Sequence, residues 1–124
     1  MVQREVLEKN PSSQLAAYII WLPVLPNDNH YHAIGARRLA LDPRALHFWN
    51  EDQSLGAGFV KALPLSEDCK LAWDVYLVYR SGVKWERMQP PQPSFWMHQL
   101  SCMRSQELRL EGKKLREAVY EAQR

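Results

Sequence analysis

Runs of apolar residues, and the polar residues that separate them, predict alternating strands and helices along the chain. Residues 16–22 are apolar at every position, and residues 75–79 form an unbroken run of β-branched, aromatic and aliphatic side chains. Runs of this length and composition are typical of strands that are buried on both faces. A shorter apolar run at residues 45–49 predicts a third strand.

Two segments between these runs have the spacing of helices. Apolar side chains recur at helical intervals in residues 29–40, after a polar cluster at residues 27–29 whose side-chain oxygens can accept hydrogen bonds from the first amides of a helix. Residues 53–63 show the same periodicity and predict a second helix. Gly56 and Gly58 within it either weaken the helix or let it pack closely.

A β-hairpin is predicted next. Gly82 can adopt the positive φ of a tight turn after the strand at residues 75–79, and residues 83–85 then return as a second, antiparallel strand. The proline-rich segment at residues 88–93 is expected to be an extended linker.

The C-terminal part predicts a long helical region with two apolar stripes. The first stripe follows Ser94 as the helix cap, and the second begins at Leu108; they are out of register, so we expect a break at residues 104–107. The second stripe either packs against the rest of the chain or forms a heptad-like dimer seam, for which Leu108, Leu115 and Val119 are the candidates.

The order of elements predicts a small α/β protein. After an irregular lead-in at residues 1–13, the order is β-α-β-α-β-β-α. Right-handed crossovers would make the first two strands parallel, and the hairpin would add an antiparallel edge. We therefore expect one domain: a three-layer sandwich with a four-stranded mixed sheet at residues 16–100, followed by a C-terminal helix at residues 101–124.

Two stretches resemble thioredoxin-like proteins. Residues 20–28, Ile-Trp-Leu-Pro-Val-Leu-Pro-Asn-Asp, look like the strand-to-helix loop that carries the CxxC motif of that family, and residues 75–85 look like its final hairpin. The resemblance implies a thioredoxin-like sandwich. It places Leu25 and Asp28 where the family has its two cysteines, and residues 72–74, Ala-Trp-Asp, where it has a cis-proline. Since neither replacement can form a thiolate, the resemblance implies a redox-inactive member rather than a thiol–disulfide oxidoreductase.

The overall charge argues against a nucleic-acid partner. The formal net charge is only +2, and no basic stripe of the kind that binds phosphates precedes the last helix. The N-terminal residues are charged and lack the apolar core of a signal peptide, and the apolar run at residues 15–25 is too short to span a bilayer. We expect a cytoplasmic protein without a membrane partner.

The two cysteines do not indicate a metal or redox motif. Cys69 and Cys102 are far apart, and neither belongs to a CxxC or zinc-knuckle pattern. We expect two free thiols in a reducing cytosol, with a disulfide as the alternative.

A ligand site is predicted at the end of the first strand. In the expected sheet, the loop after that strand and the segment before the hairpin lie at the same sheet end, where open α/β sheets bind ligands. A cleft for a small molecule or peptide would be lined by six residues: Trp21, Pro23, Asp28, His30, Trp73 and Asp74. In the alternative interpretation, the tryptophans are core residues and the aspartates are caps.

Other chemistry is weakly indicated. His30 and His32 point to different faces of a helix, so no metal or cofactor is predicted. His98 and Cys102 share a helix face in the predicted structure, but nothing marks an oxyanion hole, and no catalytic residue is assigned.

The predicted function is therefore binding of a small ligand, a peptide or a second copy of the chain. The alternatives are a small-substrate enzyme that uses acid–base chemistry at Asp28, His30 and Asp74, and a structural dimer formed through the C-terminal helix.

Overall fold

The computed structural model describes residues 1–86 and 89–124, and the chain forms two compact units, Met1–Gln53 and Ser54–Arg124. Of the expected linker at residues 88–93, Met88 lies outside the described residues.

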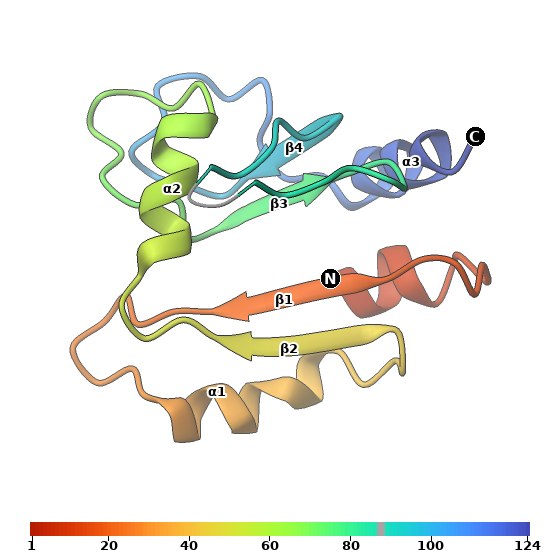
Figure 1. Cartoon of the computed structure of the whole chain (residues 1–124), viewed down its shortest axis with the longest axis horizontal. Helices are drawn as coiled ribbons and strands as arrows, with labels where there is room; N and C mark the ends of the chain where they lie inside the picture. The colour runs from red at the N-terminus through yellow and green to blue at the C-terminus, as the bar shows by residue number, and fades with distance from the viewer. Residues whose placement is uncertain (87–88) are drawn as a thin grey trace. The chain divides into compact units, whose positions relative to one another are not determined.

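The first unit is built around a parallel pair of strands. Strand β1 (Ala17–Trp21) pairs in parallel with β2 (Ala45–Trp49) over all five residues of each strand. The connection contains helix α1 (His30–Ala36) and the 3-10 helix η2 (Arg37–Leu39), as Figure 1 shows in orange and yellow. The strand–helix–strand prediction for this part of the chain is confirmed.

Helix α1 begins where its polar cluster predicts. The backbone of Asn29 is extended, and its side-chain oxygen accepts a hydrogen bond from the main-chain N–H of His32 at 3.0 Å. This bond satisfies one of the free amides at the helix start, so Asn29 is the N-cap.

The lead-in is more ordered than the sequence predicts. Residues 1–13 contain a short π-helix, η1 (Gln3–Leu7), so the expectation of an irregular segment is wrong there. Val6 and Leu7 are buried, and burial of these two apolar side chains stabilises the short helix. The charged residues around them made this segment look irregular in the sequence.

Arg44 binds this lead-in to the start of β2. Its guanidinium donates to three main-chain carbonyl oxygens: Leu7 at 2.7 Å, Asn10 at 2.6 Å and Ser12 at 2.8 Å. The same group pairs with the carboxylate of Asp42 at 2.7 Å. Five rigid donors in one plane allow Arg44 to satisfy carbonyls that no strand or helix pairs.

The second unit contains helix α2 (Ser54–Ala62), strands β3 (Val75–Val78) and β4 (Phe95–His98), and helix α3 (Gly112–Ala122). The two strands are antiparallel, and α3 contacts both of them (Figure 1). The predictions of α2 and β3 are confirmed, whereas the helix predicted at residues 101–124 is present only from Gly112 to Ala122.

The predicted hairpin is wrong in its second strand. Gly82 does adopt a positive φ of 82°, but residues 83–85 form no strand, and β3 pairs with β4 instead. Ser94 does not cap a helix: its main-chain N–H and its hydroxyl both donate to the Val78 carbonyl, at 2.8 and 2.9 Å, and so begin the ladder. A short apolar run fits a strand as well as a helix, and pairing with β3 decides between them.

The four-stranded mixed sheet, and with it the thioredoxin-like sandwich, is also wrong. In the described residues the strands form two separate two-stranded sheets, one parallel and one antiparallel. The second edge of β4 pairs with the chain's own C-terminal segment: the His98 N–H donates to Leu108 at 2.9 Å, and the Leu110 N–H donates to His98 at 2.8 Å. That edge is occupied and does not extend a larger sheet.

A disulfide joins two loops of the second unit. Cys69 and Cys102 are bonded with their Cα atoms 5.2 Å apart, so the expectation of free thiols is wrong. Both lie at one apolar core, whose buried members are Phe59, Leu63, Cys69, Ala72, Trp96, Leu100 and Met103. The two cysteines are 33 residues apart in the sequence, so their proximity depends on how the chain folds around this core and not on local sequence.

Gly56 allows a close approach within that core. A Cβ atom at this position would lie 2.7 Å from Cδ1 of Leu71 and 3.1 Å from the main-chain oxygen of Ala72. Of the two interpretations of this glycine, close packing is confirmed.

The predicted helical region after Ser94, with a break at residues 104–107, is wrong before α3, since residues 95–98 form a strand and residues 99–111 contain no helix. Leu115 and Val119 are buried, whereas Leu108 is half-buried and precedes α3. Burial within the chain favours the packing alternative over a dimer seam for Leu115 and Val119.

Candidate functional site

The residues of the predicted cleft divide between the two units. Trp21, Pro23, Asp28 and His30 belong to Met1–Gln53. Trp73 and Asp74 belong to Ser54–Arg124.

Trp21 and Pro23 are held by bonds within the first unit. The indole N–H of Trp21 donates to Nδ1 of His47 at 3.1 Å, and Nε2 of His47 lies 2.9 Å from the Ala40 carbonyl oxygen. Because an indole can only donate, Nδ1 is the acceptor and Nε2–H is the donor to the carbonyl. The Pro23 carbonyl accepts from the side-chain amide of Gln53. Both residues thus have structural roles.

Asp28 closes the loop after β1. Its carboxylate accepts from the main-chain N–H groups of Leu25 at 2.7 Å and Val24 at 2.9 Å, and these bonds, Leu25 first, lower the pKa of Asp28. A carboxyl held in its ionised form is a poor general acid. His30 is exposed, and its ring stacks on Trp49 with the ring centroids 6.1 Å apart.

Trp73 and Asp74 lie just before β3. Trp73 is exposed, and the main-chain oxygen of Asp74 accepts from the Gln99 N–H at 2.9 Å. Burial, followed by the charge of Asp74, raises the pKa of Tyr76 to about 12. The contacts of Asp74 are thus with residues of the β3–β4 sheet and its flanks, Tyr76 and Gln99.

One cavity among the described residues is one that the sequence did not predict. It has a volume of about 210 Å³ and lies beside β4 in the second unit. Its apolar wall is made by four residues: Pro64, Trp96, Met103 and Leu108. Its polar wall is made by three: His98, Ser105 and Glu107.

His98 is the unusual member of this wall, because its solvent exposure is 0%. Nδ1 accepts from the main-chain N–H of Leu100 at 3.1 Å, whereas Nε2 has no hydrogen-bond partner among the residues that the structure describes. Burial lowers the pKa of His98, and the charge of Arg109 lowers it further, against smaller opposing effects of the Ser105 carbonyl and Asp74. The lowered pKa favours the neutral form of the ring.

Neither a free thiol nor a metal-binding cluster adjoins this cavity in the described residues. Cys102 lies four residues beyond His98 but is bonded to Cys69, so it offers no thiolate nucleophile beside the histidine. In residues 1–86 and 89–124, no three His, Cys, Asp or Glu side chains gather in a way that could hold a metal ion.

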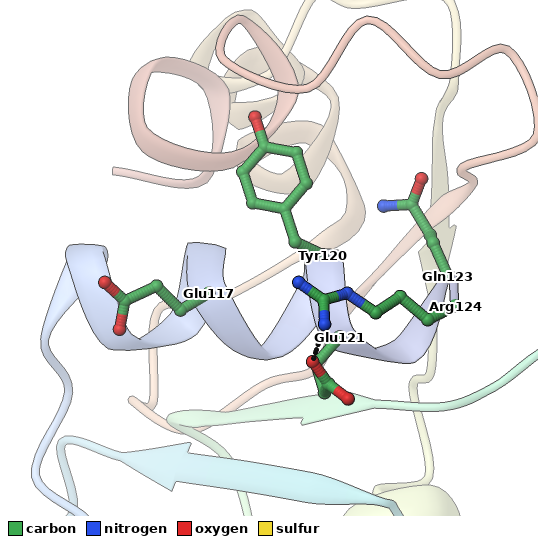
Figure 2. Close-up of a pocket in the computed structure, with 5 residues that line it drawn as sticks. All are labelled: Glu117, Tyr120, Glu121, Gln123 and Arg124. Carbon is green, nitrogen blue, oxygen red and sulfur yellow. Dashed lines mark ion pairs between the residues drawn. The ribbon is translucent and has the colours of Figure 1, made fainter.

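A wider hollow of about 550 Å³ lies along the last turns of α3 (Figure 2). It is lined by Glu117, Tyr120, Glu121, Gln123 and Arg124. Figure 2 marks the ion pair between Arg124 and Glu121, whose charged atoms are 3.5 Å apart. All five side chains are solvent-exposed or half-exposed, so this hollow lacks the buried polar group that distinguishes the cavity beside β4.

One signal in the sequence could have indicated the cavity. His98 ends the run Phe95, Trp96, Met97, and a histidine at the end of a buried apolar strand is a polar group that needs a partner. The helix prediction for this run placed His98 on the wrong element.

Within the described ranges, no helix has the length and apolar character needed to cross a membrane. No protein-family model, no curated protein and no solved structure significantly matches this chain.

Proposed function

We propose that this chain is a small-molecule-binding protein and that the ligand occupies the cavity beside β4. The observation that carries the proposal is the partnerless Nε2 of the fully buried His98 in the wall of that cavity. A buried polar group without a hydrogen bond costs about 1–3 kcal/mol, and a ligand that supplies the missing bond recovers part of this cost. Such a group inside an apolar cavity is typical of ligand sites.

The size of the cavity limits the ligand. Pockets for drug-sized molecules occupy roughly 300–1,000 Å³, whereas this cavity has about 210 Å³. The ligand is therefore a compact molecule with about one ring. A peptide does not fit, so the small-ligand form of the sequence-based expectation is the one proposed.

Binding is favoured over catalysis at the predicted acid–base residues. The Asp28 carboxylate is bonded to two main-chain N–H groups, and His30 stacks on Trp49. These contacts give both residues structural roles. The proposal also does not depend on the resemblance to thioredoxin-like proteins, because the two-stranded sheets do not form the mixed sheet of that family.

The cytoplasmic location expected from the sequence remains a proposal, and the disulfide weighs against it. Disulfides are rare in a reducing cytosol and persist in oxidising compartments. Alkylation of free thiols immediately on cell lysis tests the location: modification of Cys69 and Cys102 supports the cytosol, and protection of both contradicts it.

A screen of single-ring compounds against the isotope-labelled protein tests the proposed function. Compounds that bind should shift the nuclear magnetic resonance signals of Trp96 and His98, both in the cavity wall. Leu108→Trp fills the cavity and should abolish these shifts. Leu25→Trp, at a site 67% exposed in the other unit, should leave them unchanged. Binding that survives Leu108→Trp in a folded variant, or that perturbs neither wall residue, contradicts the proposal.

A further inference from the structure

We infer that the ligand is a small neutral planar amide whose carbonyl oxygen accepts a hydrogen bond from Nε2–H of His98 and whose N–H donates to Glu107. This inference rests on the proposed function, because it names the ligand class of the same cavity. Three features of the wall carry it: the position of the proton on His98, the charge of Glu107 and the apolar surface opposite them.

The hydrogen bond at Nδ1 fixes the position of the imidazole proton. The Leu100 main-chain N–H can only donate, so Nδ1, 3.1 Å away, must be unprotonated. A neutral imidazole then carries its proton on Nε2. The lowered pKa of His98, caused first by burial, supports a neutral ring. The cavity wall therefore contains a donor.

This donor lacks an acceptor. The main-chain carbonyl of Ser105 is the nearest acceptor to the ring, and its weak hydrogen bond opposes the lowering of the pKa of His98, but Nε2 has no partner in good hydrogen-bond geometry among the described residues. Met103 is already engaged, since its sulfur accepts from the Ser66 N–H at 3.4 Å. A ligand that completes this wall must bring an acceptor oxygen.

Glu107 decides the charge of the ligand. An anionic ligand would place its own charge beside this carboxylate, and like charges repel. A group with an acceptor and an adjacent donor satisfies both residues. The primary amide is the simplest neutral group of this kind, and Trp96, Met103 and Leu108 offer an apolar surface for its ring.

Entry of the ligand requires a small movement of the wall. His98 has no exposed surface in the free protein, whereas Ser105 and Glu107 are exposed and belong to the irregular segment before α3. Displacement of this segment would bring the amide oxygen to Nε2. Binding should therefore shift the main-chain amide signals of Ser105 and Glu107 as well as the ring signals of His98.

Three probes of similar size test the inference on the full chain: benzamide, benzoate and ethylbenzene. Titrations followed by nuclear magnetic resonance should give benzamide an affinity about tenfold higher than ethylbenzene, the value expected for one good hydrogen bond. Benzoate should bind at least as weakly as ethylbenzene, because of Glu107.

Variants assign these preferences to the two residues. His98→Phe removes the donor and should abolish the preference for benzamide over ethylbenzene, whereas His98→Gln keeps an N–H donor and should retain part of it. Glu107→Gln removes the negative charge and should raise the affinity for benzoate selectively. His32→Phe, at an exposed position of α1 in the other unit, is the control and should change no affinity.

The outcomes separate the two proposals. If none of the three probes binds in the cavity, the proposed function and the ligand class fail together. If ethylbenzene binds as tightly as benzamide to the wild-type protein, the cavity binds ligands but the role of His98 is wrong. If benzoate binds most tightly, the neutral amide is wrong. The wild-type series alone decides these points, even where His98→Phe does not fold.

Discussion

Arg44 and His98 differ in how their polar atoms are satisfied. Each guanidinium nitrogen of Arg44 donates to an acceptor, and the acceptors are three main-chain carbonyls and the carboxylate of Asp42. His98 pairs one ring nitrogen and leaves the other without a partner among the described residues. Since buried polar groups are nearly always hydrogen-bonded, a fully paired arginine indicates structure and a half-paired histidine indicates a site.

The pair of Asp42 and Arg44 makes stability depend on pH in the acid range. Hydrogen bonds from Arg44 hold the pKa of Asp42 at about 2, below its ordinary value of 3.8. The ionised carboxylate therefore stabilises the fold above pH 3.8, and this contribution is lost as the pH falls towards 2. Asp42→Asn should lower the melting temperature at pH 6 and should lower it little at about pH 2.

Asp68→Asn is the matched control for this experiment. Asp68 pairs with Arg104 at 3.6 Å, but its side chain is 68% exposed, so the substitution should have little effect at any pH. An equal loss of stability from Asp42→Asn at both pH values would contradict the assignment.

The site could be predicted less well than the fold at the scale of residues. Asn29 was identified as part of a helix cap because capping is a local interaction that sequence order reveals. The role of His98 depends on a main-chain N–H two residues later, on burial and on a loop far along the chain. The one signal in the sequence, a histidine at the end of an apolar run, was missed because that run was predicted to be helical.

At the scale of elements, the strands that correspond to apolar runs were predicted correctly. The pairing of the later strands was predicted wrongly. β1, β2 and β3 lie where their runs predict, because length and composition of these runs suffice. β4 was predicted as a helix, because its four residues are too few to show a period. The partner of β3 was consequently wrong, and so was the sheet.

Hydrogen exchange tests this reassignment. The main-chain N–H groups of Ser94 and His98 donate to Val78 and Leu108, so both should exchange slowly. The amides of residues 83–85 lie outside any strand and should exchange quickly. Slow exchange throughout residues 83–85, with fast exchange at His98, would support the hairpin predicted from the sequence and contradict the β3–β4 pair.

The close contact of Gly56 in α2 with Leu71 and Ala72 can be tested by substitution. Gly56→Ala should destabilise the protein by roughly 1–3 kcal/mol, because the new methyl group would overlap Leu71 and approach a main-chain oxygen. Gly35→Ala in α1 meets no atom within 4 Å, and it should stabilise by roughly 0.5–1 kcal/mol through helix propensity. Urea denaturation measures both. Equal effects of the two substitutions would show that Gly56 is not closely packed.

At the scale of the whole molecule, the disulfide is the main covalent constraint on the second unit. It closes a sequence separation of 33 residues between the loop after α2 and the turn after β4. The chain-entropy argument assigns about 3–4 kcal/mol of stability to a loop of this length.

Removal of the disulfide should therefore lower the free energy of unfolding by that amount. The double variant Cys69→Ser, Cys102→Ser and the reduced wild-type protein should lose stability equally, as measured by urea denaturation. The variant itself should be insensitive to reductant, which provides the control. A wild-type protein whose stability does not change on reduction, with both thiols shown to be free, would contradict a stabilising disulfide.

The division into two units separates the residues of the predicted cleft, which stays a prediction. Four of its residues belong to the first unit and two to the second, and the cleft required one continuous sheet that would bring them together. The cavity beside β4 needs only one unit, and its wall residues lie between Pro64 and Leu108.

The central claim is that His98 presents a buried, neutral Nε2–H donor to this cavity. Long-range nitrogen–proton spectra of the free protein measure the protonation of both ring nitrogens directly. We predict a ring that is less than half charged at pH 6.5, the ordinary pKa of histidine, with the proton of the neutral form on Nε2, because burial and Arg109 lower the pKa of His98 more than the Ser105 carbonyl and Asp74 raise it. A neutral form with its proton on Nδ1, or a ring at least half charged at pH 6.5, would contradict the account.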